Sequence, residues 1–110
     1  MQTAHHEEGT VSIVAVTGRV DSSTAPELET ALKKLVEAEK TQLVLDLKEV
    51  EYMSSAGLRA MVSTLKAVKR VNGDLRVASP SDRVNEVLRL AGLSSIFAIY
   101  STREEAVKSY

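Results

Sequence analysis

An uninterrupted aliphatic run followed by a long amphipathic stripe constrains this chain more than any other feature. Residues 43–47 read Leu-Val-Leu-Asp-Leu, which indicates a strand buried on both faces, as in a parallel sheet. Apolar residues then recur with helical spacing, separated by polar ones, at Leu58, Met61, Val62, Leu65 and Val68. A buried strand that runs directly into an amphipathic helix predicts an α/β fold.

The corner between this strand and this helix, residues 53–59, reads Met-Ser-Ser-Ala-Gly-Leu-Arg. Ser54 and Ser55 stand where the helix needs an N-cap, because their hydroxyl groups can accept the unpaired N–H groups of the first turn. Two interpretations stay open: the serines only cap the helix, or one of them also carries a phosphate. Gly57 costs roughly 0.8–1 kcal/mol relative to Ala inside a helix. We expect it to leave room for a partner at an exposed helix end, so that a larger residue disturbs docking more than folding.

The segments before this unit predict a hairpin and a first helix. Residues 1–6 are a candidate edge strand, residues 7–9 a turn, and residues 11–17 a second strand that Gly18 ends. Pro26 fits the first turn of the helix, whose apolar stripe comprises Leu28, Ala31, Leu32, Leu35 and Val36.

The remaining segments alternate between helix and strand. The pattern predicts, in order, a connection at 48–52, a strand at 75–78, a helix capped by Ser81 and closed by Gly92, a strand at 96–100, a capping box at 101–104 and a helix over 105–110. Repeated βαβ units require right-handed crossovers and parallel strands. The opening hairpin adds an antiparallel edge, so we expect a mixed β-sheet packed with about four helices.

Composition excludes several classes of function. With 110 residues the chain fits a single domain, and its 14 Lys+Arg against 15 Asp+Glu give no basic excess of the kind that nucleic-acid binders show. The chain has no Cys, which excludes disulfide, thiol and cysteine–zinc chemistry. No apolar run approaches the ~18 residues of a membrane span, and no signal peptide opens the chain. We expect a cytoplasmic protein that binds neither nucleic acid nor membrane.

The residues that catalysis would need are missing. Ser55 is not in a Gly-x-Ser-x-Gly elbow, and neither a dinucleotide fingerprint nor a P-loop occurs. His5 and His6 are adjacent, so on a strand they point to opposite faces, and no third metal ligand is near in sequence. Asp46 ends a strand, as the phosphoacceptor of a response-regulator receiver does, but residues 10–18 supply no acidic pair. We expect no enzyme, no metal and no cofactor.

Residues 50–58, Val-Glu-Tyr-Met-Ser-Ser-Ala-Gly-Leu, resemble the signature of STAS domains, specifically the anti-sigma factor antagonists of bacterial sporulation and stress control. The turn at 18–21 (Gly-Arg-Val-Asp), the turn at 72–75 (Asn-Gly-Asp-Leu) and the late helix from Arg83 to Gly92-Leu93 are also similar to that family. The resemblance covers nearly the whole chain and implies a single STAS domain over residues 1–110.

The resemblance also implies a site. It aligns Ser55 with the phosphoacceptor at the N-terminus of the second helix, and it places Ser54 where the best-known members carry aspartate. Asp21 then lies on the same rim, although by its own chemistry it is also a turn residue. The implied partner-binding residues are Asp21, Ser54, Ser55, Ala56, Gly57, Leu58 and Arg59.

Family membership implies a phosphorylation switch. The unphosphorylated protein would bind an anti-sigma factor that is itself a serine kinase, phosphorylation of Ser55 would release it, and a serine phosphatase would reset it. A second possibility is a non-switching STAS module in a multiprotein assembly such as a lipid-transport complex. A third is nucleotide binding at the rim of Asp21 and Ser55, for which the sequence supplies no phosphate loop.

Overall fold

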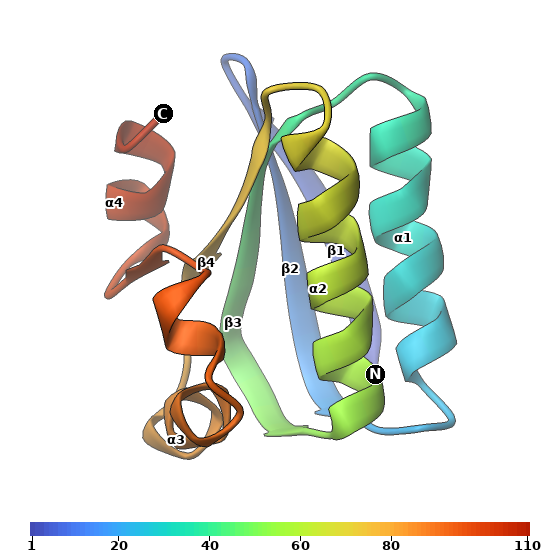
Figure 1. The fold of residues 1–110 in the computed structure, drawn as a ribbon, viewed down its shortest axis with the longest axis vertical. Coiled ribbons are helices and arrows are strands. Elements are labelled where there is room, and N and C mark those ends of the chain that lie inside the picture. Colours follow the sequence, from blue (N-terminus) through green and yellow to red (C-terminus); the bar gives the residue numbers. More distant parts are fainter.

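The computed structural model describes residues 1–110. Strands and helices alternate after an opening hairpin, in the order β1 (Gln2–Glu8), β2 (Val11–Val20), α1 (Ala25–Glu37), β3 (Gln42–Met53), α2 (Ser55–Lys69), β4 (Asp74–Ala78), α3 (Asp82–Leu90), the 3-10 helix η1 (Leu93–Ser95), β5 (Ile99–Tyr100) and α4 (Arg103–Lys108). The predicted alternation of elements is confirmed (Figure 1).

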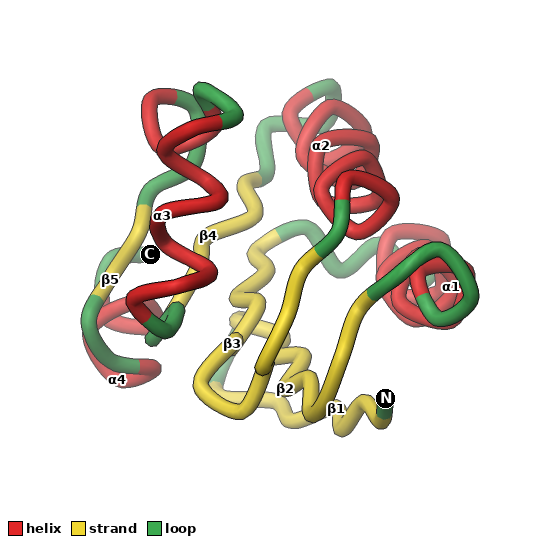
Figure 2. Tube along the Cα trace, turned by 90° about the horizontal axis from the view of Figure 1, so that it is seen from below, coloured by secondary structure: helices red, strands yellow, loops and turns green.

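The five strands form one mixed sheet in the order β1-β2-β3-β4-β5. β1 is antiparallel to β2, whereas β2, β3, β4 and β5 are mutually parallel. Seen from below in Figure 2, α1 and α2 lie side by side on one side of the sheet and α4 lies on the other. α3 lies on the β4–β5 side of the sheet, away from β1. The predicted α/β class with an antiparallel edge is therefore correct.

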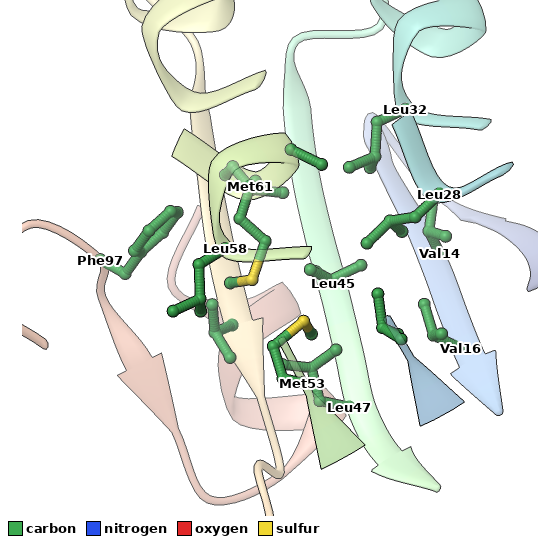
Figure 3. Packing of buried hydrophobic residues seen from close by; sticks show 14 of the residues in the cluster. Val14, Val16, Leu28, Leu32, Leu45, Leu47, Met53, Leu58, Met61 and Phe97 are labelled. Atoms are coloured by element: carbon green, nitrogen blue, oxygen red, sulfur yellow. The ribbon is translucent and has the colours of Figure 1, made fainter. Parts of the chain in front are cut away.

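Two apolar clusters hold these layers together. The larger one fills the space between the sheet and the α1–α2 pair and contains Leu28, Leu45 and Met61 (Figure 3). The smaller one lies under α4 and contains Val44 and Ala106. Val44 and Leu45 are adjacent on β3 and belong to different clusters, which confirms that residues 43–47 are buried on both faces.

The central strands are longer than the sequence predicted. Residues 48–52, predicted as a connection, continue β3 to Met53, and β2 continues past Gly18 to Val20. The pairing continues through two register shifts, opposite Ala15–Thr17 and Gly18–Arg19 of β2, at each of which β3 contains one extra residue and bulges. As a result Val20 pairs with Met53, and both strands end at the same place.

The segment after α3 also differs from the prediction. Residues 96–100 were predicted as a strand, but only Ile99 and Tyr100 pair with β4. The Leu93 carbonyl accepts the N–H groups of Ile96 (3.1 Å) and Phe97 (3.0 Å), which curls the chain into η1 instead. Gly92 has a φ of 76° directly after the Ala91 cap, as predicted for a glycine that closes a helix.

The closing helix begins earlier and is capped differently than predicted. It spans Arg103–Lys108 rather than 105–110, and the cap is Thr102 rather than Ser101. The Thr102 hydroxyl accepts the Glu105 N–H at 3.1 Å, so the cap has the predicted Ser/Thr-x-x-Glu spacing but begins one residue later.

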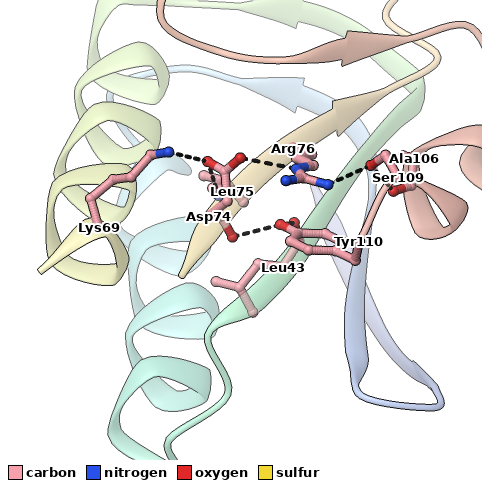
Figure 4. Close-up of polar contacts among 8 residues, drawn as sticks. All are labelled: Leu43, Lys69, Asp74, Leu75, Arg76, Ala106, Ser109 and Tyr110. Atoms are coloured by element: carbon pink, nitrogen blue, oxygen red, sulfur yellow. Dashed lines mark hydrogen bonds and ion pairs between the residues drawn. The ribbon is translucent and has the colours of Figure 1, made fainter. Parts of the chain in front are cut away.

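Tyr110 fastens this helix to the sheet (Figure 4). Its hydroxyl oxygen lies 2.6 Å from the carbonyl oxygen of Leu43 and 2.7 Å from that of Asp74, at the starts of β3 and β4, and its single hydrogen is shared between the two carbonyl groups. The Arg76 guanidinium lies 3.9 Å from the centre of the Tyr110 ring and donates to the Ser109 hydroxyl at 2.7 Å. These contacts hold α4 over the smaller cluster, at the end of the sheet opposite to the carboxyl end of β3.

Tyr110 gives the fold an alkaline limit. Burial, followed by the nearby charge of Asp74, raises the pKa of the Tyr110 phenol well above its ordinary value. A pKa that is higher in the folded than in the unfolded state stabilises the fold below the unfolded-state pKa, about 10, and this contribution is lost as the pH rises above it. We expect the urea midpoint of the wild type to fall more steeply from pH 9 to 11 than that of Tyr110→Phe. Parallel curves would show that Tyr110 does not control the alkaline limit.

Candidate functional site

The corner between β3 and α2 separates the roles of the two serines. Ser54 is the N-cap of α2, and its hydroxyl accepts the Gly57 N–H at 3.4 Å. Its backbone is fixed on both sides, because Ser54 N–H donates to Val20 O at 2.8 Å and Ser54 O accepts from Leu58 N–H at 3.0 Å. The structure thus confirms that Ser54 caps the helix, which both sequence-based interpretations of this corner include.

Ser55 is the first residue of α2 and is exposed. Its side chain takes part in no hydrogen bond within the protein, whereas the neighbouring Ser54 hydroxyl is engaged. The first turn of α2 carries no acidic side chain, unlike those of α1, α3 and α4. A negatively charged group on the Ser55 oxygen would therefore meet the positive end of the helix dipole without a competing carboxylate.

Asp21 organises the turn that follows β2. Its Oδ1 atom accepts the Ser23 hydroxyl (2.7 Å), the Ser23 N–H (3.0 Å) and the Thr24 N–H (3.1 Å). The Ser23 hydroxyl above all, with these N–H groups, holds the pKa of the Asp21 carboxyl below its ordinary value. The turn interpretation of Asp21 is thus confirmed. Because Val20 pairs with Met53, Asp21 and Ser54 follow neighbouring strand ends and lie at the same edge of the sheet.

Gly57 faces the core rather than a partner. It is buried, and a Cβ atom built on it would lie 2.3 Å from Met53 Sδ and 2.8 Å from Val20 Cγ1. Its φ is not in the left-handed region, so the close approach of these side chains is what requires glycine here. The expectation that Gly57 leaves room at an exposed helix end is wrong. The sequence could not reveal this, because the contact with Val20 depends on the β2–β3 pairing.

Leu58 and Arg59 are consecutive residues of α2 that differ in burial. Leu58 is 9% exposed and belongs to the larger cluster, where Figure 3 shows it near Met53. Arg59 is exposed, and Ala56 is half-buried. Of the predicted partner-binding residues, the structure therefore brings Ser55 and Arg59 fully to the surface, with Asp21, Ser54 and Ala56 partly accessible.

A groove of about 570 Å³ begins at Ser55 and follows α2. One wall is α2 and the other is the segment after α3. Eight residues line it, two of them cationic and none acidic: Ser55, Leu58, Arg59, Val62, Ser63, Lys66, Ala91 and Leu93. Sequence reasoning missed this groove, because its walls are some thirty residues apart in the chain and no local pattern connects them.

Two further pairs of side chains stabilise this end of the protein. The Arg19 guanidinium lies 4.6 Å from the centre of the Tyr52 ring, and these residues pair across β2 and β3. Asp46 is 6% exposed and accepts Arg103 Nε at 2.8 Å and the Lys48 N–H at 3.0 Å. The Asp46 carboxylate thus ties β3 to α4.

The structure contains no group of three His, Cys, Asp or Glu side chains placed to hold a metal ion. His5 and His6 are exposed on the edge strand β1, and His5 Nε2 lies 3.4 Å from Glu7 Oε1. None of the helices combines the length and the apolar composition that a membrane span requires.

Comparison with known proteins agrees with this architecture. Residues 2–106 match the STAS domain family. The anti-sigma-B factor antagonist of Listeria monocytogenes is 34% identical over 92 residues, which are 84% of this chain and 81% of that protein. An anti-sigma factor antagonist from Mycobacterium paratuberculosis superimposes with a TM-score of 0.91 and 30% identity, covering 98% of this chain and 92% of that one.

The antagonist SpoIIAA shares the fold in both of its solved forms. Its unphosphorylated form gives a TM-score of 0.86 at 16% identity, over 98% of this chain and 95% of that one. Its phosphorylated form gives 0.77 at 15% identity, over 98% of each chain. The sheet order and the corner at Ser54 and Ser55 agree with these matches. The chain therefore belongs to the STAS domain family, among the anti-sigma factor antagonists.

Proposed function

We propose that this protein is a phosphorylation-switched antagonist of an anti-sigma factor. Unphosphorylated, it binds a cytoplasmic anti-sigma factor that is a serine kinase, and the sigma factor is released. The kinase transfers the γ-phosphoryl group of ATP to Ser55 Oγ, ADP leaves, and the modified antagonist dissociates. A serine phosphatase returns it to the binding form. The protein acts by binding and performs no catalysis itself.

The observation that carries this proposal is the difference between two adjacent hydroxyl groups. Ser54 caps α2 and is held by the backbone of Gly57, whereas Ser55 is exposed and unpaired at the same helix end. A phosphoacceptor must present a free hydroxyl, and of the two only Ser55 does so. SpoIIAA, which shares the fold, occurs in phosphorylated and unphosphorylated forms, and this supports phosphorylation as the switch.

The proposed contact surface combines the corner with the groove beside it. Asp21, Ser54, Ser55, Ala56 and Arg59 supply its accessible groups, while Leu58 forms part of the groove wall. Gly57 is buried under this surface and supports it by letting α2 lie close to the side chains of Val20 and Met53. The surface is apolar along the groove and cationic at its rim, which suits a partner segment with apolar and acidic side chains.

Phosphosite mapping tests the assignment of the acceptor. With the cognate kinase and ATP, Ser55→Ala should lose phosphorylation. Ser54→Ala should retain most of it, because loss of the N-cap costs only about 1 kcal/mol of helix stability. Intact-mass and peptide mass spectrometry measure the product. Retention in Ser55→Ala together with loss in Ser54→Ala would move the acceptor to the cap and overturn the assignment.

A further inference from the structure

Arg59 is the nearest cation to Ser55 along α2 and has no partner of its own. It is exposed, and none of the ion pairs of the protein includes it. It follows Ser55 by four residues, so the two side chains are neighbours on one helical face, with Cβ atoms about 5–6 Å apart. Both line the same groove.

The other charged groups around the corner are less well placed. Lys66 lines the groove eleven residues after Ser55, which is about 16 Å along the helix axis. Glu29 of α1 borders a second hollow that Arg59 also lines, without forming an ion pair with it. The Asp21 carboxylate is already bound by Ser23 and Thr24. A new anion at Ser55 would therefore find one free guanidinium within reach.

The order of the two groups along the helix is also the favourable one. An anion placed four residues before a cation is better than the reverse, since each charge then lies nearer the helix pole that attracts it. A guanidinium can moreover donate two parallel N–H groups to one phosphate, which an ammonium group cannot match.

We propose that Arg59 is the intramolecular ligand of the phosphate on Ser55. It holds the phosphate down along α2, across the mouth of the groove, and in doing so it withdraws its own charge from the surface offered to the partner. The inference rests on the proposed phosphorylation of Ser55 and adds a specific positioning residue to that site.

A titration of the phosphate tests this without the kinase. Phosphoserine is installed at position 55 during translation, and the ³¹P chemical shift is followed from pH 4 to 8. A free phosphoserine loses its second proton near pH 6, and a bound guanidinium lowers that pKa because it favours the dianion. In Arg59→Gln the midpoint should rise by about 0.3, the equivalent of one exposed i,i+4 pair. Arg59→Lys should lie in between.

Lys66→Gln is the matched control, because it removes a cation from the same helix and groove. Its midpoint should equal that of the parent protein. An unchanged midpoint in Arg59→Gln, or an equal rise in both variants, would overturn the role of Arg59. Both residues are exposed, and circular dichroism verifies that the variants are folded. Since the phosphate is introduced without the kinase, this result is independent of whether the kinase binds or modifies Ser55.

Discussion

Phosphorylation of Ser55 is expected to weaken binding of the anti-sigma factor kinase more than a hundredfold while the fold stays intact. The phosphate adds about −1.5 to −2 charges near pH 7, and the N-terminus of α2 stabilises that charge. The loss therefore arises at the interface, where a bulky dianion meets a close-packed partner surface. A penalty of ~3 kcal/mol suffices for the hundredfold effect. Calorimetric titration of both forms measures it.

Ser55→Asp should reproduce part of this loss, with at least tenfold weaker binding, because it adds one charge and less bulk. Ser101→Asp is the control, since Ser101 is exposed beside α4, away from the corner. Chemical-shift differences between the two phosphorylation forms should be confined to Asp21 and residues 54–59. Extensive shifts through the core would contradict the local mechanism, and equal binding by both forms would favour a static STAS module.

Gly57→Ala is expected to destabilise the domain by about 1–3 kcal/mol, the usual cost of forcing an extra carbon into a packed core. The added Cβ would meet Met53 Sδ and Val20 Cγ1, and both of these residues are almost completely buried. The better helix propensity of Ala, worth about 1 kcal/mol, offsets only part of that strain. Urea denaturation measures the difference.

Two controls separate overpacking from other effects. Ser63→Ala, at an exposed position of the same helix, should be neutral or slightly stabilising. Met53→Ala removes the closest side-chain atom, so the double variant with Gly57→Ala should be more stable than the sum of the two single losses. Strict additivity, or a Gly57→Ala protein as stable as the parent, would show that the core yields without strain.

The parts of the fold that were predictable are those that local patterns specify. The short aliphatic run at 43–47 indicates a buried strand, and the stripe from Leu58 to Val68 indicates one face of a helix. Ser54 as a cap and Gly92 as a helix end follow from the chemistry of single residues. These elements leave few possible arrangements of the strands and helices in space, because few topologies connect them without crossing loops.

The parts that were not predictable depend on distant pairing. Lys48 and Glu49 are both charged and interrupt the apolar run, so only the pairing with β2, through bulges in β3, makes residues 48–52 a strand. The burial of Gly57 requires Val20, and the groove beside Ser55 requires Leu93. The hydrogen bond between the Tyr110 hydroxyl and the Leu43 carbonyl joins residues far apart in the chain, and the composition of neither segment predicts it.

The double anchoring of Ser54, through Val20 on one side and Leu58 on the other, has a consequence for recognition. Ser54, the residue before the proposed acceptor, is hydrogen-bonded to the end of β2, and Ser55 itself begins a helix. An enzyme that modifies Ser55 must therefore accept an intact folded surface, and the shape of the domain replaces a linear sequence motif as the substrate signal.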